Sequence, residues 1–166
     1  MTDLSGPRIP SLRSKVSAAE WQARVELAAC YRLIAHFGMN DLIYNHATAR
    51  VPGEEGHFLI NPYGYAYEEV SASSLIKIDF DGKVVLDSGT GYGINHAGFV
   101  IHSAIHAARD DAHCIIHTHT TAGSAVASKK DGLRYDNFYS GILHGEVAYH
   151  DFEGITVNPE EGPRML

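Results

Sequence analysis

The sequence predicts a layered domain of the α/β or α+β class, on three observations. Its 166 residues suffice for one domain with a real core. Segments with helical spacing of apolar residues alternate with short apolar runs that are typical of strands. Two of these runs flank Asp81-Gly82, a turn signal that joins neighbouring antiparallel strands. Helices and strands of this kind bury their apolar faces by packing as layers.

The chain is expected to begin with an irregular arm over residues 1–16 and to continue as one domain over residues 17–166. Ser17 and Glu20 form a capping box, in which each side chain satisfies the other residue's backbone donor. A helix should follow to about Phe37, because apolar residues recur at helical spacing and Gly38 is a natural stop.

Four strands are predicted next. They cover residues 42–51, 58–60, 75–79 and 83–86, with a turn at residues 71–74 before the third. A glycine-rich loop follows over residues 88–95. Its spacing does not match the dinucleotide-binding fingerprint, so it is interpreted as a flexible loop over a site or as a plain connector.

A helix predicted for residues 98–109 places His102 and His106 near one apolar face. Two histidines at this spacing bind zinc in some proteases, but the glutamate of that motif is absent because position 103 is serine. Packing is therefore favoured over metal ligation for both histidines.

The next predicted strand, over residues 113–119, carries two histidines two residues apart. Because alternate side chains of a strand point to the same face, His117 and His119 should project side by side, with Thr118 turned away. Imidazole is a common zinc ligand, so this strand could supply two of the three or four ligands of a metal site. In a chain with 11 histidines, the pair could equally form hydrogen bonds in a core.

Beyond this pair, a helix is expected from Thr120 or Thr121 to residue 128, followed by short strands at residues 146–149 and 155–157. Residues 158–166 are typical of a loop entering a helix. The domain is therefore interpreted as incomplete at its C-terminus.

Composition argues against several classes of protein. No apolar run is long enough to span a membrane, and the first ten residues lack the core of a signal peptide, so a cytoplasmic location is expected. A net charge of −7 with scattered basic residues argues against nucleic-acid binding. Cys30 and Cys114 have no C-x-x-C partner and are predicted to be reduced, buried thiols.

Several motifs in the same order resemble the class II aldolase/adducin family, with an adducin-like branch nearest. They lie at residues 43–46, 49–51, 58–64, 72–79, 98–109, 117–120 and 145–151. The resemblance implies an α-β-α three-layer fold around a mixed, mostly antiparallel central sheet. It also implies a ring-shaped homotetramer with active sites between subunits, and enzymes that include sugar-phosphate aldolases, an epimerase, dehydratases and decarboxylases.

The family's enzymes hold a divalent metal, often zinc, with three histidines. The metal polarises the oxygen of an enediolate. His117 and His119 match the first two ligands, and the third belongs to a later segment, beyond residue 166. His144 or His150 could take its place in space, although no family motif puts them there. Zinc is the preferred ion for nitrogen ligands, with manganese, cobalt and iron as alternatives.

The chain departs from the aldolases at two further places. Gly98 stands where the family has a glutamate that takes part in proton transfer. The phosphate-binding positions are also altered, at Asn45-His46, Tyr63-Gly64 and His96-Ala97. The hydroxyls and small backbone donors that suit a phosphate are lost, so a non-phosphorylated substrate is expected. A tyrosine of a neighbouring subunit donates a proton in the family, and Tyr135 and Tyr139 are both candidates.

Two functions follow from the resemblance. The first is a divalent-metal-dependent, aldolase-type carbon–carbon lyase that acts on a small hydroxy- or keto-carbonyl compound. The second is a non-catalytic, adducin-like module whose oligomeric surface binds or organises partners. The retained histidine pair favours the first, and the missing glutamate and altered phosphate positions favour the second.

Overall fold

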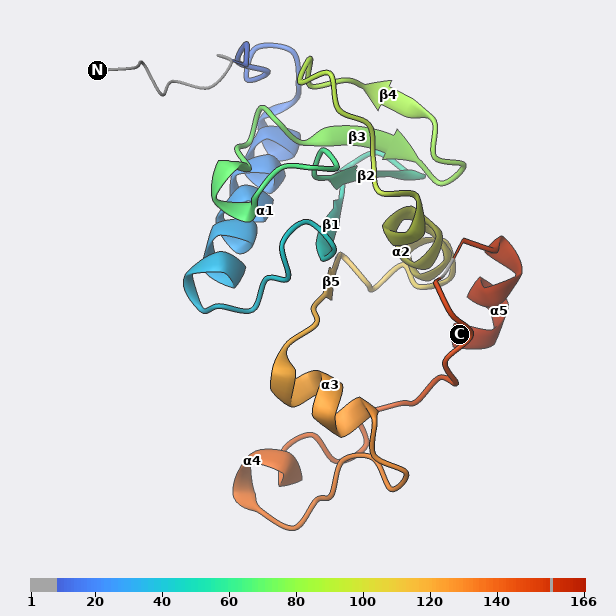
Figure 1. Ribbon diagram of the computed structural model, residues 1–166. Helices are drawn as coiled ribbons and strands as arrows, with labels where there is room; N and C mark the ends of the chain where they lie inside the picture. The colour runs from blue at the N-terminus through green and yellow to red at the C-terminus, as the bar shows by residue number, and fades with distance from the viewer. Residues whose placement is uncertain (1–8, 156) are drawn as a thin grey trace.

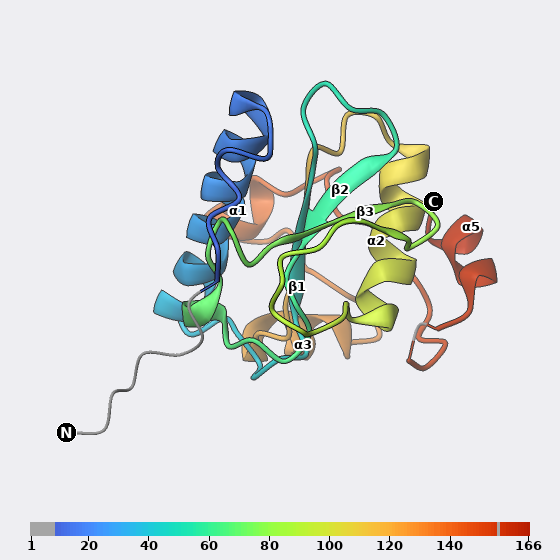
Figure 2. The same cartoon turned by 90° about the horizontal axis from the view of Figure 1, so that it is seen from above.

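A five-stranded antiparallel sheet lies between two long helices in the computed structural model, which describes residues 9–155 and 157–166. The strands follow the order β4-β3-β2-β1-β5. Their bounds are His46–Arg50 (β1), His57–Ile60 (β2), Ile76–Asp79 (β3), Val84–Leu86 (β4) and Cys114–His117 (β5). Helix α1 (Ala18–His36) covers one face and α2 (His96–Ala108) the other, as Figure 2 shows. The predicted three-layer fold is confirmed, and every strand pair among the described residues is antiparallel.

The side chains of β2 divide the core between the two faces. Leu59 packs with Tyr31 in the cluster beneath α1. Phe58 and Ile60, its neighbours along the strand, pack with Phe99 in the cluster beneath α2. All three β2 side chains are fully buried, and each contributes about 1.5–3 kcal/mol of transfer free energy. Alternation along a single strand therefore fixes both helices to the sheet.

Helix α1 begins as predicted, but its capping box is only half formed. The Ser17 hydroxyl accepts a hydrogen bond from the backbone N–H of Glu20 at 3.0 Å. The Glu20 carboxylate does not return to Ser17 and instead binds Arg24 at 2.8 Å and Lys77 at 2.9 Å. Two buried cations are stronger partners for a carboxylate than one backbone N–H, which explains why the prediction was wrong for Glu20.

Two strands are shorter than predicted, and both changes affect the histidines. Strand β1 starts at His46, because Leu42 has a positive φ of 49° and residues 41–44 form a turn, in which the backbone N–H of Tyr44 donates to the carbonyl of Asp41. Strand β5 ends at His117, so His119 lies in the following segment. The predicted hairpin of β3 and β4 is confirmed, with Gly82 at a φ of 82° in its turn.

The chain after β5 extends away from the sheet (Figure 1). It contains α3 (Thr121–Ala127), which confirms the predicted helix, and α4 (Phe138–Gly141). The strand predicted for residues 146–149 is wrong, because these residues form no regular element, and the one predicted for residues 155–157 includes position 156, which lies outside the described residues. Two 3₁₀ turns, Tyr67–Glu69 and Pro159–Glu161, and the short α5 (Gly162–Met165) complete the elements described.

The two cysteines are free but not both buried. Cys30 is half-buried on α1, and Cys114 is exposed on β5, the edge strand of the sheet. The prediction of two buried thiols is therefore wrong, because Cys114 is exposed and Cys30 is only partly buried. Residues 1–8 of the predicted arm lie outside the described part of the chain. Within the described residues, no helix is both long and apolar enough to cross a membrane.

Candidate metal and substrate site

His117 and His119 converge, although not in the way a strand alone would place them. His117 is the last residue of β5, and His119 follows it, just before α3. The two rings are perpendicular, and their Nε2 atoms lie 2.7 Å apart. The pair thus directs two ring nitrogens to one point, where parallel projection from a strand was predicted.

Asp41, in the turn before β1, supports this pair. Its Oδ2 lies 2.8 Å from Nδ1 of His119. A carboxylate on one ring nitrogen keeps the proton there, so the lone pair of His119 is on Nε2. Two nitrogens that each lie 2.0–2.1 Å from a tetrahedral zinc ion would be about 3.3 Å apart, so a small rotation of either ring would admit an ion.

These donors fit two positions of a metal site. No group of three or more His, Cys, Asp or Glu side chains with metal-binding geometry occurs in the part of the chain that is described. Neither His144 nor His150 joins the pair. His150 binds Glu161 at 3.2 Å, and His144 packs against Tyr135 with ring centres 5.1 Å apart.

A cavity of about 1400 Å³ opens beside the pair. Its walls include Asp41, His46, His117 and His119, with Tyr63 and Asn95 near the start of α2. The glycine-rich loop reaches this region, because the backbone N–H of Tyr63 donates to Gly93 at 2.8 Å. Lys129, Lys130, Tyr149 and residues 150–155 also line the cavity.

The register of β1 and β5 brings a third histidine to the pair. His46 lies directly opposite His117, and the two rings stack with centres 4.8 Å apart. Burial, followed by the nearby His117 and His119, lowers the pKa of His46 to about 3. Burial and the neighbouring His119 also lower the pKa of His117. The rings are therefore neutral at physiological pH, which is the state that binds metal.

His46 explains why position 98 is glycine. A Cβ built on Gly98 would lie 2.4 Å from Cδ2 and 2.7 Å from Nε2 of His46. No side chain fits there without moving the imidazole. The space beside position 98, where the resemblance places a glutamate, is thus filled by a histidine from β1.

Replacing Gly98 by alanine is therefore expected to destabilise the fold. Overpacking of this kind costs about 1–3 kcal/mol, which exceeds the gain of up to about 1 kcal/mol from alanine in a helix. Chemical denaturation would measure the loss. Gly93→Ala is the matched control, because a Cβ there meets no atom within 4 Å. Equal stability of the two variants would contradict the close fit of His46.

His102 and His106 are fully buried beneath the sheet, which confirms the prediction that they pack. The Thr48 hydroxyl lies 2.7 Å from Nδ1 of His102 and 2.9 Å from Nε2 of His106. His102 also reaches His46, with Nε2 and Nδ1 3.0 Å apart. Burial lowers the pKa of His102 to about 2 and that of His106 to about 4.

Reasoning from the sequence identified the histidine pair but missed the residues that surround it. Asp41 directly precedes the residues predicted as a strand, and no local pattern pairs it with His119. His46 was noted only as a departure at a phosphate-binding position, and Thr48 carried no signal. Both candidate proton donors, Tyr135 and Tyr139, are exposed.

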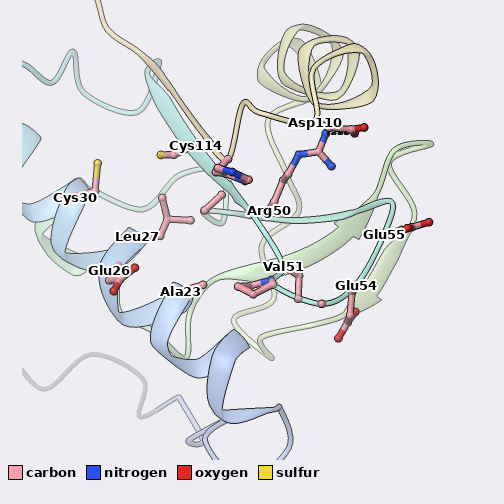
Figure 3. A pocket seen from close by; sticks show the side chains of 14 residues that line it. Ala23, Glu26, Leu27, Cys30, Arg50, Val51, Glu54, Glu55, Asp110 and Cys114 are labelled. Atoms are coloured by element: carbon pink, nitrogen blue, oxygen red, sulfur yellow. Dashed lines mark hydrogen bonds and ion pairs between the residues drawn. The ribbon is translucent and has the colours of Figure 1, made fainter.

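A second cavity, of about 740 Å³, lies between α1 and the edge of the sheet (Figure 3). Its acidic side chains do not converge: Glu26 lies on α1, Glu54 and Glu55 lie on the loop after β1, and Figure 3 shows Glu55 pointing away from Glu26. Arg50 is turned toward Asp110, to which it binds at 3.5 Å. This cavity offers a ligand no set of converging polar groups, so the histidine-lined cavity is the candidate site.

Comparisons with known proteins identify the family of the chain. The family model of the Class II Aldolase and Adducin N-terminal domain matches residues 25–161. A candidate aldolase class 2 protein of Caulobacter vibrioides is 54% identical over 94% of this chain, and the chain spans 60% of that protein. Rat alpha-adducin is 53% identical over 83% of this chain, which spans 19% of the adducin.

Solved structures give the same result. An aldolase II superfamily protein from Pseudomonas syringae superposes with a TM-score of 0.90 at 51% identity, over 94% of this chain and 62% of that one. An L-fuculose 1-phosphate aldolase from Glaciozyma antarctica superposes with a TM-score of 0.72 at 31% identity, over 84% of this chain and 55% of that one. With its sheet, its histidine pair and its family match in agreement, the chain belongs to the class II aldolase and adducin family.

Proposed function

We propose that this chain carries two metal ligands of a divalent-metal-dependent, aldolase-type carbon–carbon lyase. The observation that carries the proposal is the convergence of Nε2 of His117 and Nε2 of His119 at 2.7 Å, with Asp41 behind His119. A carboxylate behind a ligating histidine is the usual support of a metal site. Zinc is the preferred ion, and the described residues offer no third His, Cys, Asp or Glu ligand beside the pair, so water or substrate would fill the remaining positions.

A divalent ion at this site would supply Lewis-acid stabilisation of negative charge on a substrate oxygen. The chain's own residues have three tasks around it. Asp41 holds His119 with its lone pair toward the site. The stacked ring of His46 fixes the orientation of His117. The cavity wall gives a small carbonyl compound a place beside the pair.

A non-phosphorylated hydroxy- or keto-carbonyl compound is the proposed substrate. The wall offers an imidazole at position 46 and a phenol at position 63, where small donors would suit a phosphate. Lys129 and Lys130 also line the cavity and would complement one carboxylate, as in a hydroxy- or keto-acid.

Metal content tests the proposal directly. Elemental mass spectrometry of the purified chain after zinc reconstitution is expected to find close to one ion per chain in the wild type. His117→Ala and His119→Ala should each lose most of the zinc, because each variant removes one of the two histidine ligands. His113→Ala, which replaces an exposed histidine just before the same strand, is the control and should retain the ion. Unchanged zinc in both site variants would refute the proposal.

An adducin-like scaffold is the second candidate, supported by the 53% identity to rat alpha-adducin. It is also supported by exposed apolar side chains after β5, which mark surfaces that proteins bury on association: Phe138, Tyr139, Ile142, Phe152 and Ile155. A stable homo-oligomer without zinc uptake or lyase activity would favour the scaffold. Light scattering coupled to size exclusion measures the assembly, for which a tetramer is proposed in either case.

A further inference from the structure

A buried line of hydrogen bonds connects the cavity to the far end of α2. It runs from His46 through His102 and Thr48 to His106, and it ends on the carbonyl oxygen of Ala112. The four successive distances are 3.0, 2.7, 2.9 and 3.0 Å. His46 is 3% exposed and the other three side chains are fully buried, so water does not compete for their protons.

The Ala112 carbonyl fixes the direction of this line. A carbonyl oxygen can only accept, so Nδ1 of His106 carries a proton. Burial keeps His106 neutral, so its Nε2 has a lone pair and accepts from the Thr48 hydroxyl. A hydroxyl has a single proton, so the Thr48 oxygen must in turn accept from Nδ1 of His102.

The direction of the hydrogen bonds is also fixed between His102 and the cavity. Burial keeps His102 neutral, so its Nε2 accepts from Nδ1 of His46. A neutral His46 with its proton on Nδ1 has its lone pair on Nε2. That atom makes no hydrogen bond to another residue of the described chain, and it is not sealed from solvent. It lies on the side of the ring next to Gly98, in a side chain that lines the cavity.

We infer that His46 is a substrate-contacting residue whose Nε2 accepts a hydrogen bond from a substrate hydroxyl, and that the line from Ala112 holds it in this tautomer. Thr48 is then a positioning residue, because it acts through His102. The substrate contact rests on the proposed function, whereas the tautomer does not. A compound with a hydroxyl beside its carbonyl should bind better than the analogue without it.

Nitrogen NMR tests the tautomer without any assay of activity. Two-bond ¹H–¹⁵N correlation spectra of the metal-free chain, labelled with ¹⁵N-histidine at neutral pH, show which ring nitrogen of each histidine is protonated. The proton should be on Nδ1 in His46, His102 and His106. A proton on Nε2 of His46 in the wild type would overturn the inference.

Two variants at position 48 separate the hydroxyl from its volume. Thr48→Val has nearly the same shape but no hydroxyl, so Nδ1 of His102 loses its acceptor. His102 and then His46 should change to the Nε2–H tautomer. Thr48→Ser is the matched control, because it keeps the hydroxyl and should keep all three tautomers. Unchanged tautomers in Thr48→Val would overturn the inference, and the wild-type spectrum decides the matter if that variant does not fold.

A probe tests the contact itself. Dihydroxyacetone added to the zinc-loaded chain should shift the Nε2 resonance of His46, and acetone, which lacks both hydroxyls, should not. A shift at His119 without one at His46, or no shift at any histidine, would overturn the contact. Failure of the wild type to take up zinc would instead refute the proposed function, while the metal-free spectra would still decide the tautomer.

Discussion

Lowering the pH from 7 to 5 is expected to reduce the free energy of unfolding by about 3–4 kcal/mol through His102 and His106 alone. Burial lowers the pKa of His102 to about 2 and that of His106 to about 4, whereas both titrate near 6.5 in the unfolded chain. Between these values the unfolded state binds protons that the folded state does not. Stability is therefore fully present above pH 6.5 and is lost as the pH falls.

Urea unfolding at several pH values measures this slope. Each buried histidine adds about 1.4 kcal/mol per pH unit at most, so the pair gives about 2.7 kcal/mol per unit below pH 6. His106→Gln removes one titrating group and should reduce the measured slope by up to about 1.4 kcal/mol per pH unit. His113→Ala, at an exposed position, should leave it unchanged. A flat profile between pH 7 and 5 would show that these rings are not buried as neutral groups.

Local patterns predicted most of the fold because local interactions determine those parts. The start of α1, the β3–β4 turn and the start of α3 each depend on residues within a few positions of one another. The predicted length of β1 was wrong because a side chain forms the turn before it. The backbone N–H of Asp41 donates a hydrogen bond to the side-chain oxygen of Asn45. Such a bond competes with strand pairing and leaves no periodic signal.

The candidate site, unlike most of the fold, depends on contacts between residues far apart in sequence. His117 and His119 were found because they are two residues apart, but their partners are distant in sequence. Asp41 is 78 positions from His119, and His46 faces His117 only through the register of β1 and β5. Strand register is decided by which faces are buried across the whole sheet, so a single sequence does not reveal it. The sequence shows at Gly98 only the absence of the family's glutamate. The structure shows that the ring of His46 leaves no room for a side chain at this position.

A group of charged residues lies between α1 and the sheet. Glu20 and Arg24 are almost completely buried, and Lys77 is 8% exposed. The Glu20 carboxylate binds Arg24 at 2.8 Å and Lys77 at 2.9 Å, and Lys77 also binds Glu54 at 3.0 Å. Burial opposes the charge of Lys77, but the hydrogen bonds that it donates to Glu20 and Glu54 outweigh burial and raise the pKa of Lys77.

Glu20→Gln is therefore expected to lower the free energy of unfolding by about 3–5 kcal/mol, because it leaves two buried cations without their shared anion. Denaturant unfolding at neutral pH measures the loss. Glu26→Gln, an exposed position on the same helix, should change stability by less than about 0.5 kcal/mol. Adding Lys77→Met to Glu20→Gln should recover part of the loss, since it removes the cation that keeps only one of its two carboxylates, Glu54. If Glu20→Gln were as stable as Glu26→Gln, Glu20 would not be the anion that balances this buried charge, and α1 would be held to the sheet by its apolar face alone.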